Sequence, residues 1–388
     1  MHRTGFIALF LVLFAPAVGT AQLSKLPRPD SLEASFFGGA VAIDGHWAVV
    51  GASDDDRCGP HSGSAWVFRR QGDTWVQAGA LMPSECEEGA FFGRAVALDR
   101  GRIAISAYRT FIGRAVSNHV YIFEQRDGMW QQTARIASPD RDASGPFAAA
   151  LDLDGNRLLV TSAGDASGTG ANGKGFVFKR SSGRWGLEDT LESPLPLEAG
   201  TLGMSAVMDG DWIAISGSTY TRNKAGFVAL YRRNGDEWNH FSSVRGIKGF
   251  FIDVDLRGDR LLVGEPRGGI QGSGSARLLR FADNAWTDET VLRPRLPYAA
   301  GAFGMRVALG HDVALISGFD EQLELDINVD QVVYVFERSS EGWRQRRVLD
   351  VGASAFGAAL SIDGTQALIG QAAEGIPGQA YFAPIERP

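Results

Sequence analysis

The stretch Phe37-Gly38-Gly39-Ala40-Val41-Ala42-Ile43-Asp44-Gly45 returns in altered form along the whole chain. It joins an aromatic residue and a glycine to an alternating apolar strand and an acidic turn. Six further copies follow it, and successive copies begin 55, 55, 55, 48, 53 and 53 residues apart. Self-similarity at a period of about 50 residues predicts a repeat architecture. The later copies begin at Phe92, Phe147, Leu202, Phe250, Phe303 and Phe356.

Each copy carries signals for four short strands. In the first copy they are expected at 41–43, 47–52 and 65–68, and from Trp75 onward. The turn Asp44-Gly45 predicts a two-residue hairpin in which both central residues have positive φ. The Trp that opens the fourth strand recurs at Trp130, Trp185, Trp238, Trp286 and Trp343.

Seven four-stranded antiparallel units of this size predict an all-β fold, a seven-bladed β-propeller in which neighbouring blades bury each other's faces. Residues 22–388 are expected to form this single domain, with blades starting near residues 36, 91, 146, 201, 249, 302 and 355. The seventh copy ends after its third strand, near residues 380–383. Its fourth strand is therefore expected from residues 22–26, which would close the ring.

The Phe-Gly phrase and the Val50-Gly51-Ala52-Ser53 run resemble FG-GAP repeats. The resemblance covers residues 22–388 and implies a propeller like those of integrin α-subunits and of many exported bacterial proteins. Many integrin-type repeats carry an Asp-x-Asp-x-Asp-Gly calcium loop. No intact copy occurs here, so no cofactor is expected. Calcium stays open only at residues 326–330, which carry oxygen ligands at alternate positions.

The first residues have the pattern of a secretory signal peptide. His2 and Arg3 precede an apolar run from Phe6 to Phe14, and Gly19 and Ala21 offer small residues before a cleavage point. Residues 1–21 are therefore expected to be removed, and the protein to be extracellular, surface-bound or periplasmic. No later segment is long enough and apolar enough to span a membrane.

The chain has only two cysteines, Cys58 and Cys86, and both fall in loops on one rim of the expected ring. In an exported protein this arrangement predicts a disulfide, with two free thiols as the alternative.

The same loop face is expected to carry an acidic sector. Carboxylates concentrated in one region attract a cation or a basic partner. The candidate ligand-binding residues are Asp54, Asp55, Asp56, Asp320, Glu324, Asp326, Asp330 and Glu374. On the first strands of blades five and six, Asp253 and Arg306 are expected to form an inner ion pair.

Charge and motif content exclude several functions. The balance of 38 basic against 45 acidic residues argues against nucleic-acid binding. No Gly-x-Ser-x-Gly, His-Glu-x-x-His or Cys-x-x-Cys motif occurs, and the six histidines are dispersed. The sequence thus favours a monomeric, exported, non-enzymatic binding or adhesion module with a protein or glycan ligand on its loop face. A surface scaffold is one alternative. A hydrolase or lyase acting on extracellular carbohydrate is the other.

Overall fold

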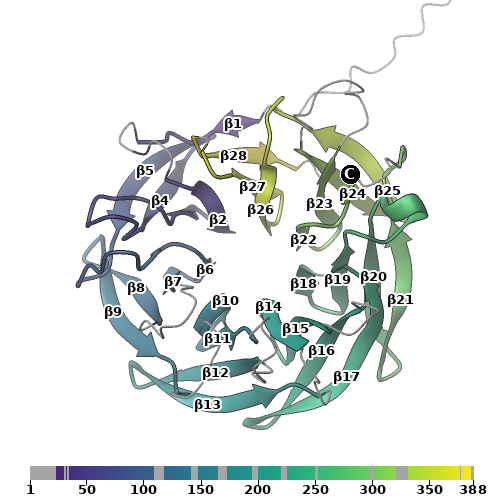
Figure 1. Cartoon of the computed structure of the whole chain (residues 1–388), viewed down its shortest axis with the longest axis horizontal. Helices are drawn as coiled ribbons and strands as arrows, with labels where there is room; N and C mark the ends of the chain where they lie inside the picture. Colours follow the sequence, from purple (N-terminus) through teal and green to yellow (C-terminus); the bar gives the residue numbers. More distant parts are fainter. Residues whose placement is uncertain are drawn as a thin grey trace, which may run out of the picture.

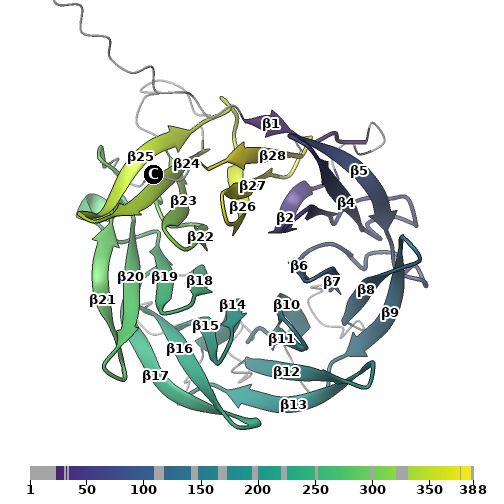
Figure 2. The same ribbon diagram turned by 180° about the vertical axis from the view of Figure 1, so that it is seen from behind.

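The computed structural model describes residues 23–29, 32, 35–108, 118–140, 147–164, 173–194, 200–219, 225–249, 252–297, 301–319, 331–375 and 377–385. The strands form seven four-stranded sheets arranged radially around a central axis. Figure 1 shows the ring from one end of this axis, and Figure 2 shows it from behind. The predicted fold class, a seven-bladed all-β propeller, is confirmed.

Blades one to four each use four consecutive strands, the first beside the axis and the fourth on the rim. Blade one has β2 (Phe37–Asp44), β3 (Trp47–Ala52), β4 (Ser64–Gln71) and β5 (Thr74–Leu81). Blade two has β6 (Val96–Asp99), β7 (Arg102–Ala107), β8 (His119–Arg126) and β9 (Met129–Ala137). Blade three has β10 (Phe147–Asp154), β11 (Arg157–Ser162), β12 (Lys174–Ser181) and β13 (Arg184–Glu192). Blade four has β14 (Gly200–Asp209), β15 (Trp212–Thr219), β16 (Ala225–Asn234) and β17 (Glu237–Lys248).

Blades five and six repeat this arrangement, and blade seven takes its rim strand from the other end of the chain. Blade five has β18 (Val254–Arg257), β19 (Arg260–Glu265), β20 (Ser275–Ala282) and β21 (Ala285–Leu292). Blade six has β22 (Val307–Leu309), β23 (Val313–Phe319), β24 (Gln331–Ser339) and β25 (Gly342–Leu349). Blade seven has β26 (Phe356–Asp363), β27 (Gln366–Gln371), β28 (Gln379–Pro384) and β1 (Ser24–Lys25).

The ring is closed by β1, as the sequence predicts. Ser24 lies opposite Phe382 in the antiparallel register. The N–H of Leu26 donates a 2.9 Å hydrogen bond to the carbonyl of Ala380. The Leu26 side chain is only 2% exposed and belongs to the core between blades seven and one. Backbone pairing and apolar burial therefore hold the two chain ends together.

The hairpins between first and second strands differ from the prediction. Asp44 pairs with Trp47, so the two loop residues are Gly45 and His46. Only Gly45 has a positive φ, of 56°. The prediction that Asp and Gly are both central residues was therefore wrong. The aspartate ends the strand, and its Oδ2 accepts a 2.6 Å hydrogen bond from the N–H of Arg100 in the next blade.

The same interblade bond recurs around one mouth of the central channel. In each case an aspartate ends the first strand of one blade. Its carboxylate accepts a 2.6–2.7 Å hydrogen bond from the backbone N–H of the glycine that follows the first strand of the next blade. Arg257 occupies the place of this aspartate in blade five, in the Arg-Gly-Asp sequence of a hairpin turn. The bonds run from Gly45 to Asp363, from Gly155 to Asp99, from Gly210 to Asp154 and from Gly258 to Asp209.

The Phe-Gly phrase marks the place where adjacent blades touch through their backbones. A Cβ on Gly51 would lie 1.9 Å from the carbonyl oxygen of Gly93, whose φ is 94°. Beside it, the fully buried Phe92 packs edge-on against Tyr121 and Phe123. Glycine lets the blades approach, and phenylalanine fills the space next to the contact.

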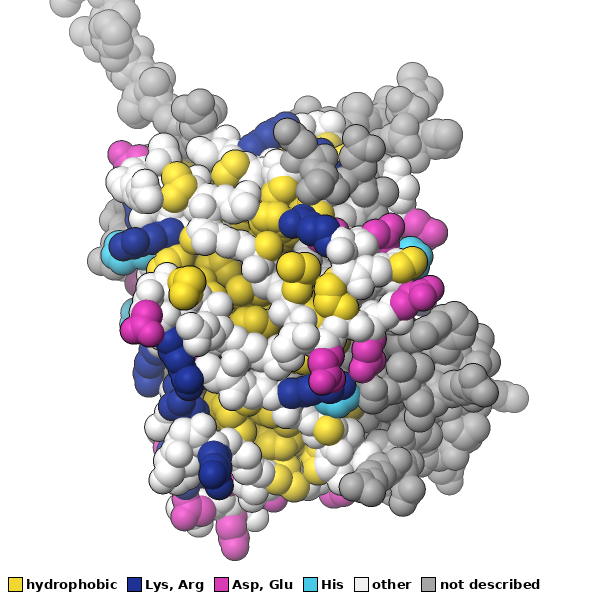
Figure 3. All heavy atoms as spheres, turned by 90° about the vertical axis from the view of Figure 1, so that its left-hand side faces the viewer, with side chains coloured by type: hydrophobic (Ala, Val, Ile, Leu, Met, Phe, Trp, Pro, Cys, Tyr) yellow, Lys and Arg dark blue, Asp and Glu magenta, His cyan; other side chains and the backbone are white. Residues whose placement is uncertain are grey.

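The rim strands are buried on one side only. In β5, Trp75 is 7% exposed, while most of its neighbours in the strand are partly or fully exposed. Figure 3 shows the wall at the left of Figure 1, where hydrophobic side chains are visible between charged side chains of both signs.

Candidate functional site

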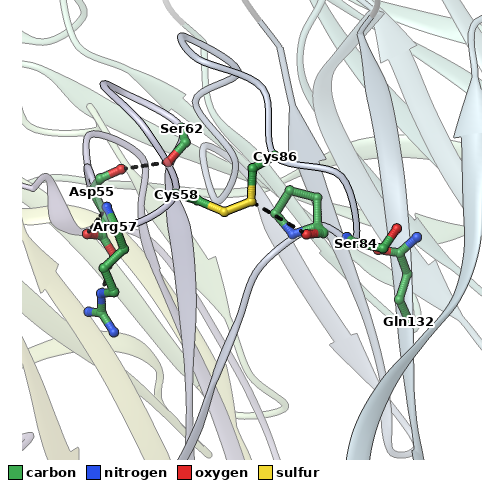
Figure 4. The surroundings of a disulfide bond; sticks show 8 residues. Asp55, Arg57, Cys58, Ser62, Ser84, Cys86 and Gln132 are labelled. Atoms are coloured by element: carbon green, nitrogen blue, oxygen red, sulfur yellow. Dashed lines mark hydrogen bonds and ion pairs between the residues drawn. A yellow bond between two sulfur atoms is a disulfide. The ribbon is translucent and has the colours of Figure 1, made fainter.

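The loop between β3 and β4 is tied to the segment that leads into blade two. Cys58 and Cys86 form a disulfide with their Cα atoms 5.7 Å apart, which confirms the predicted bond. Figure 4 shows it joining the two loops. The N–H groups of Gly89 and Phe91 donate to the carbonyls of Pro60 and His61, at 2.8 and 3.0 Å. We call residues 53–63 and 84–91, together with Arg94 and Tyr108, the blade-one platform.

The three consecutive aspartates of this loop have different surroundings. Asp55 is only 4% exposed. Its Oδ2 accepts a 2.5 Å hydrogen bond from the Ser64 hydroxyl and lies 3.1 Å from Nε of Arg57. Its Oδ1 accepts the N–H of Arg57 at 3.2 Å. Asp55 therefore shapes the loop from inside, whereas Asp54 and Asp56 lie nearer its surface.

His61 connects the two outer aspartates to an aromatic ring. The imidazole Nδ1 lies 3.5 Å from Oδ1 of Asp54. The backbone N–H of His61 donates a 2.7 Å hydrogen bond to Oδ1 of Asp56. The imidazole stacks on Phe91, with ring centroids 5.6 Å apart and an interplanar angle of 23°. The side chain is 60% exposed, so this stack is part of the outer surface.

The stack continues toward the central axis through a cation. The Arg94 guanidinium lies 6.0 Å from the Phe91 ring and 4.6 Å from the Tyr108 ring. Arg94 also lines the mouth of the axial channel. His61, Phe91, Arg94 and Tyr108 thus form a continuous row of three rings and one guanidinium group.

The sequence analysis did not select this row, although it contained a signal. Phe36 and Phe91 stand immediately before the repeated phrase, so each forms a doubled Phe. Both have left-handed backbones, with φ of 55° and 50°. The equivalent Ala302 and Ala355 have the same backbone, with φ of 48° and 61°, so the bulky side chain is what distinguishes Phe36 and Phe91. Both side chains are partly exposed.

Of the other predicted acidic residues, the structure describes only Glu374. Glu374 is exposed and lies in the turn between β27 and β28. The remaining residues of the expected sector, and with them the calcium hypothesis, lie outside the described residues. They are Asp320, Glu324, Asp326 and Asp330.

The axial channel is the second candidate site. Its cavity of about 430 Å³ is lined by the first strands of all seven blades. The expected ion pair between Asp253 and Arg306 is not formed. Asp253 accepts hydrogen bonds from the Ser205 hydroxyl at 2.8 Å and from the Val307 N–H at 2.9 Å. Nε of Arg306 donates instead to the carbonyl of Ala358, at 3.0 Å.

Two further carboxyls in the channel wall also join neighbouring blades. Oδ2 of Asp152 accepts the N–H of Met208 at 2.8 Å, and Oδ2 of Asp255 accepts the N–H of Leu309 at 2.6 Å. Burial raises the pKa of Asp152 to about 8 and that of Asp255 to about 7, against the lowering effect of these bonds. Both carboxyl groups accept hydrogen bonds from backbone N–H groups, which suits a structural role.

Within the described part of the chain, no group of three or more His, Cys, Asp or Glu side chains is arranged to hold a metal ion. The described residues also include no helix that is long and apolar enough to cross a membrane.

Comparison with known proteins gives one family. The model of the FG-GAP repeat matches residues 20–68, which include β1 to β3 and most of β4, and residues 75–123, which include most of β5 to β8. No curated protein matches the chain. The repeat match and the seven radial sheets agree with each other: the chain carries FG-GAP repeats in residues 20–123 and folds as a seven-bladed β-propeller.

Proposed function

We propose that this protein is an exported, non-enzymatic binding or adhesion module that takes its ligand on the blade-one platform. The observation that carries the proposal is the row His61, Phe91, Arg94 and Tyr108, in which the segments of His61 and Phe91 are joined by a disulfide. A surface fixed before binding loses little conformational entropy when the ligand arrives.

The composition of the row suits a protein or a glycan. Partly exposed aromatic rings supply apolar contact area at low entropic cost, and Arg94 supplies several N–H donors. Asp54 and Asp56 stand beside His61 as acceptors. A monomer presents this surface once, on one side of the loop face.

Export is supported by the disulfide, because such bonds persist in oxidising compartments.

The described carboxyls of the channel favour binding over catalysis. Asp152, Asp253 and Asp255 each accept backbone N–H groups from a neighbouring blade. A hydrolase or lyase needs an acid or base that reaches its substrate. The exposed row of His61, Phe91 and Arg94 favours a binding module over a pure scaffold.

The test is a binding screen against immobilised glycans and purified extracellular proteins, read by surface plasmon resonance. We expect H61A and R94A each to weaken binding of the ligand found at least tenfold. R344A, which changes an exposed arginine on the rim of blade six, should bind as the unaltered protein does. Equal binding by all three variants would place the ligand elsewhere.

A further inference from the structure

A groove of about 620 Å³ lies on the rim between blades four and five. Its walls come from the middle of β17, from β20 and β21, and from the turn that joins the latter two. Figures 1 and 2 both show β17 and β21 following one another along the rim. The groove is separate from the blade-one platform, and its function does not depend on the function proposed for that platform.

The residue three positions after the rim tryptophan differs from blade to blade. Three residues after the rim tryptophan, blades three and five carry Glu188 and Glu289. Each accepts a hydrogen bond from the rim tryptophan of the following blade: Trp238 Nε1 to Glu188 at 3.4 Å, and Trp343 Nε1 to Glu289 at 3.3 Å. A carboxylate thus closes the outer part of these two boundaries.

Blade four has Phe241 at this position, so the boundary with blade five has no such carboxylate. The indole Nε1 of Trp286 is buried and has no hydrogen-bond partner among the described residues. The rings of Phe241 and Trp286 instead pack against Trp212, with centroids 5.0 and 5.2 Å away. Both rings line the groove and are partly exposed.

The polar side of the groove has one fixed arginine and one unpaired arginine. Nη2 of Arg277 donates to both oxygens of Asp288, at 2.8 and 3.0 Å. Nη1 of Arg277 donates to the carbonyl of Arg245 at 3.3 Å. The exposed guanidinium of Arg245 has no partner among the described residues. Hydroxyls of Ser242, Ser243 and Thr287 also line the groove.

We propose that this groove binds an acidic oligosaccharide, with a uronic acid as the recognised unit. The apolar face of a sugar ring fits against the exposed aromatic surface of Phe241 and Trp286. Its hydroxyls find donors and acceptors in the serine and threonine hydroxyls and in Asp288. The carboxylate is the complement of Arg245, since a guanidinium presents two parallel N–H groups to a carboxylate.

The experiment is a calorimetric titration of the intact protein with three probes at low salt. They are hexagalacturonate, which is acidic, cellohexaose, which is neutral, and a ten-residue oligothymidylate, which is a polyanion without pyranose rings or carboxylates. We expect hexagalacturonate to bind at least tenfold more tightly than cellohexaose, and the oligothymidylate to show no binding at the same concentrations.

Two variants assign the contacts. R245A should lower the affinity for hexagalacturonate to that for cellohexaose and leave cellohexaose unchanged. F241Q removes the aromatic surface and gives Trp286 an acceptor, so both sugars should bind at least tenfold more weakly. A78Q makes the same kind of change at the equivalent, exposed position of blade one and should bind as the unaltered protein does.

The proposal is overturned if hexagalacturonate does not bind at millimolar concentration, or if R245A binds it with unchanged affinity. Equal affinity for the oligothymidylate would replace the saccharide with a nucleic acid as the ligand. Loss of binding in A78Q, or in the platform variant R94A, would place the site elsewhere.

Discussion

The N–H of Met208 donates a 2.8 Å hydrogen bond to Oδ2 of Asp152, across the boundary between blades three and four. Asp255 makes the equivalent contact with Leu309 between blades five and six. These carboxyls have pKa values of about 8 and about 7, against an ordinary value of 3.8.

The first prediction concerns pH. Between pH 4 and 8 the folded state holds more protons on these two groups than the unfolded chain does. The free energy of unfolding should therefore fall as pH rises through this window, by at most about 1.4 kcal/mol per pH unit for each group. Urea unfolding at a series of pH values measures the slope, and D152N/D255N should flatten it.

A control for this prediction is S361A. The Ser361 hydroxyl also accepts an interblade N–H, from Ile43 at 3.2 Å, but it does not titrate in this range. S361A should lower stability evenly at all pH values. A slope unchanged in D152N/D255N would show that other groups cause the dependence.

The second prediction concerns the carboxylate between blades three and four. Glu188 is 5% exposed and accepts hydrogen bonds from Nε of Arg157 at 2.7 Å and from Trp238. E188A leaves these donors without an acceptor and should cost about 2–4 kcal/mol of unfolding free energy in urea titrations. E341A removes an exposed partner of Arg344 and should cost under about 0.5 kcal/mol. Similar losses in both variants would contradict this account.

The third prediction concerns the backbone contact between blades one and two. G51A places a methyl group on the carbonyl of Gly93, and neither backbone can yield without separating the blades. We expect a loss of at least about 3 kcal/mol, measured by thermal and urea unfolding. G79A is the control, because nothing lies within 4 Å of its added Cβ. A G51A variant as stable as G79A would show that the blades are not held this closely.

The fourth prediction concerns the disulfide. The bond joins residues 28 positions apart, which in the chain-entropy model stabilises the fold by about 3–4 kcal/mol. The variant C58A/C86A should unfold at correspondingly lower urea concentration. Because the bond also fixes the blade-one platform, ligand binding there should weaken. An unchanged urea midpoint would mean that the hydrogen bonds from Gly89 and Phe91 hold the loop alone.

The sequence alone predicts the architecture because each copy of the repeat contains the residues that determine its own turns and strands. A glycine beside Phe92, a tryptophan at the start of β5 and a turn after Asp44 are visible within one copy. The closing strand is predictable because the seventh copy ends after its third strand, near residues 380–383. The disulfide followed from the loop positions that the repeat gives to Cys58 and Cys86.

The candidate sites were harder to predict, since their partners lie about 50 residues away in a neighbouring blade. The sequence suggests Asp55 as a ligand-binding residue on the surface. Its hydrogen bond with the Ser64 hydroxyl places it inside the loop. Asp253 accepts hydrogen bonds from Ser205 and Val307 and forms no ion pair with Arg306. The groove is lined by Phe241 of one blade and Trp286 of the next, which lie 45 residues apart in the sequence.

The strand that closes the ring also sets an order of assembly. Leu26 meets Gln379, 353 positions later, so the early segment has no place to pair until nearly the whole chain has been synthesised. Blade one therefore leaves the ribosome before its neighbour, blade seven, has been made, whereas each later blade can stack on the blade before it. The pairing of β1 with β28 closes the largest loop of the fold, and this pairing forms last. Mechanical force applied between the termini would act first on this short two-residue pairing.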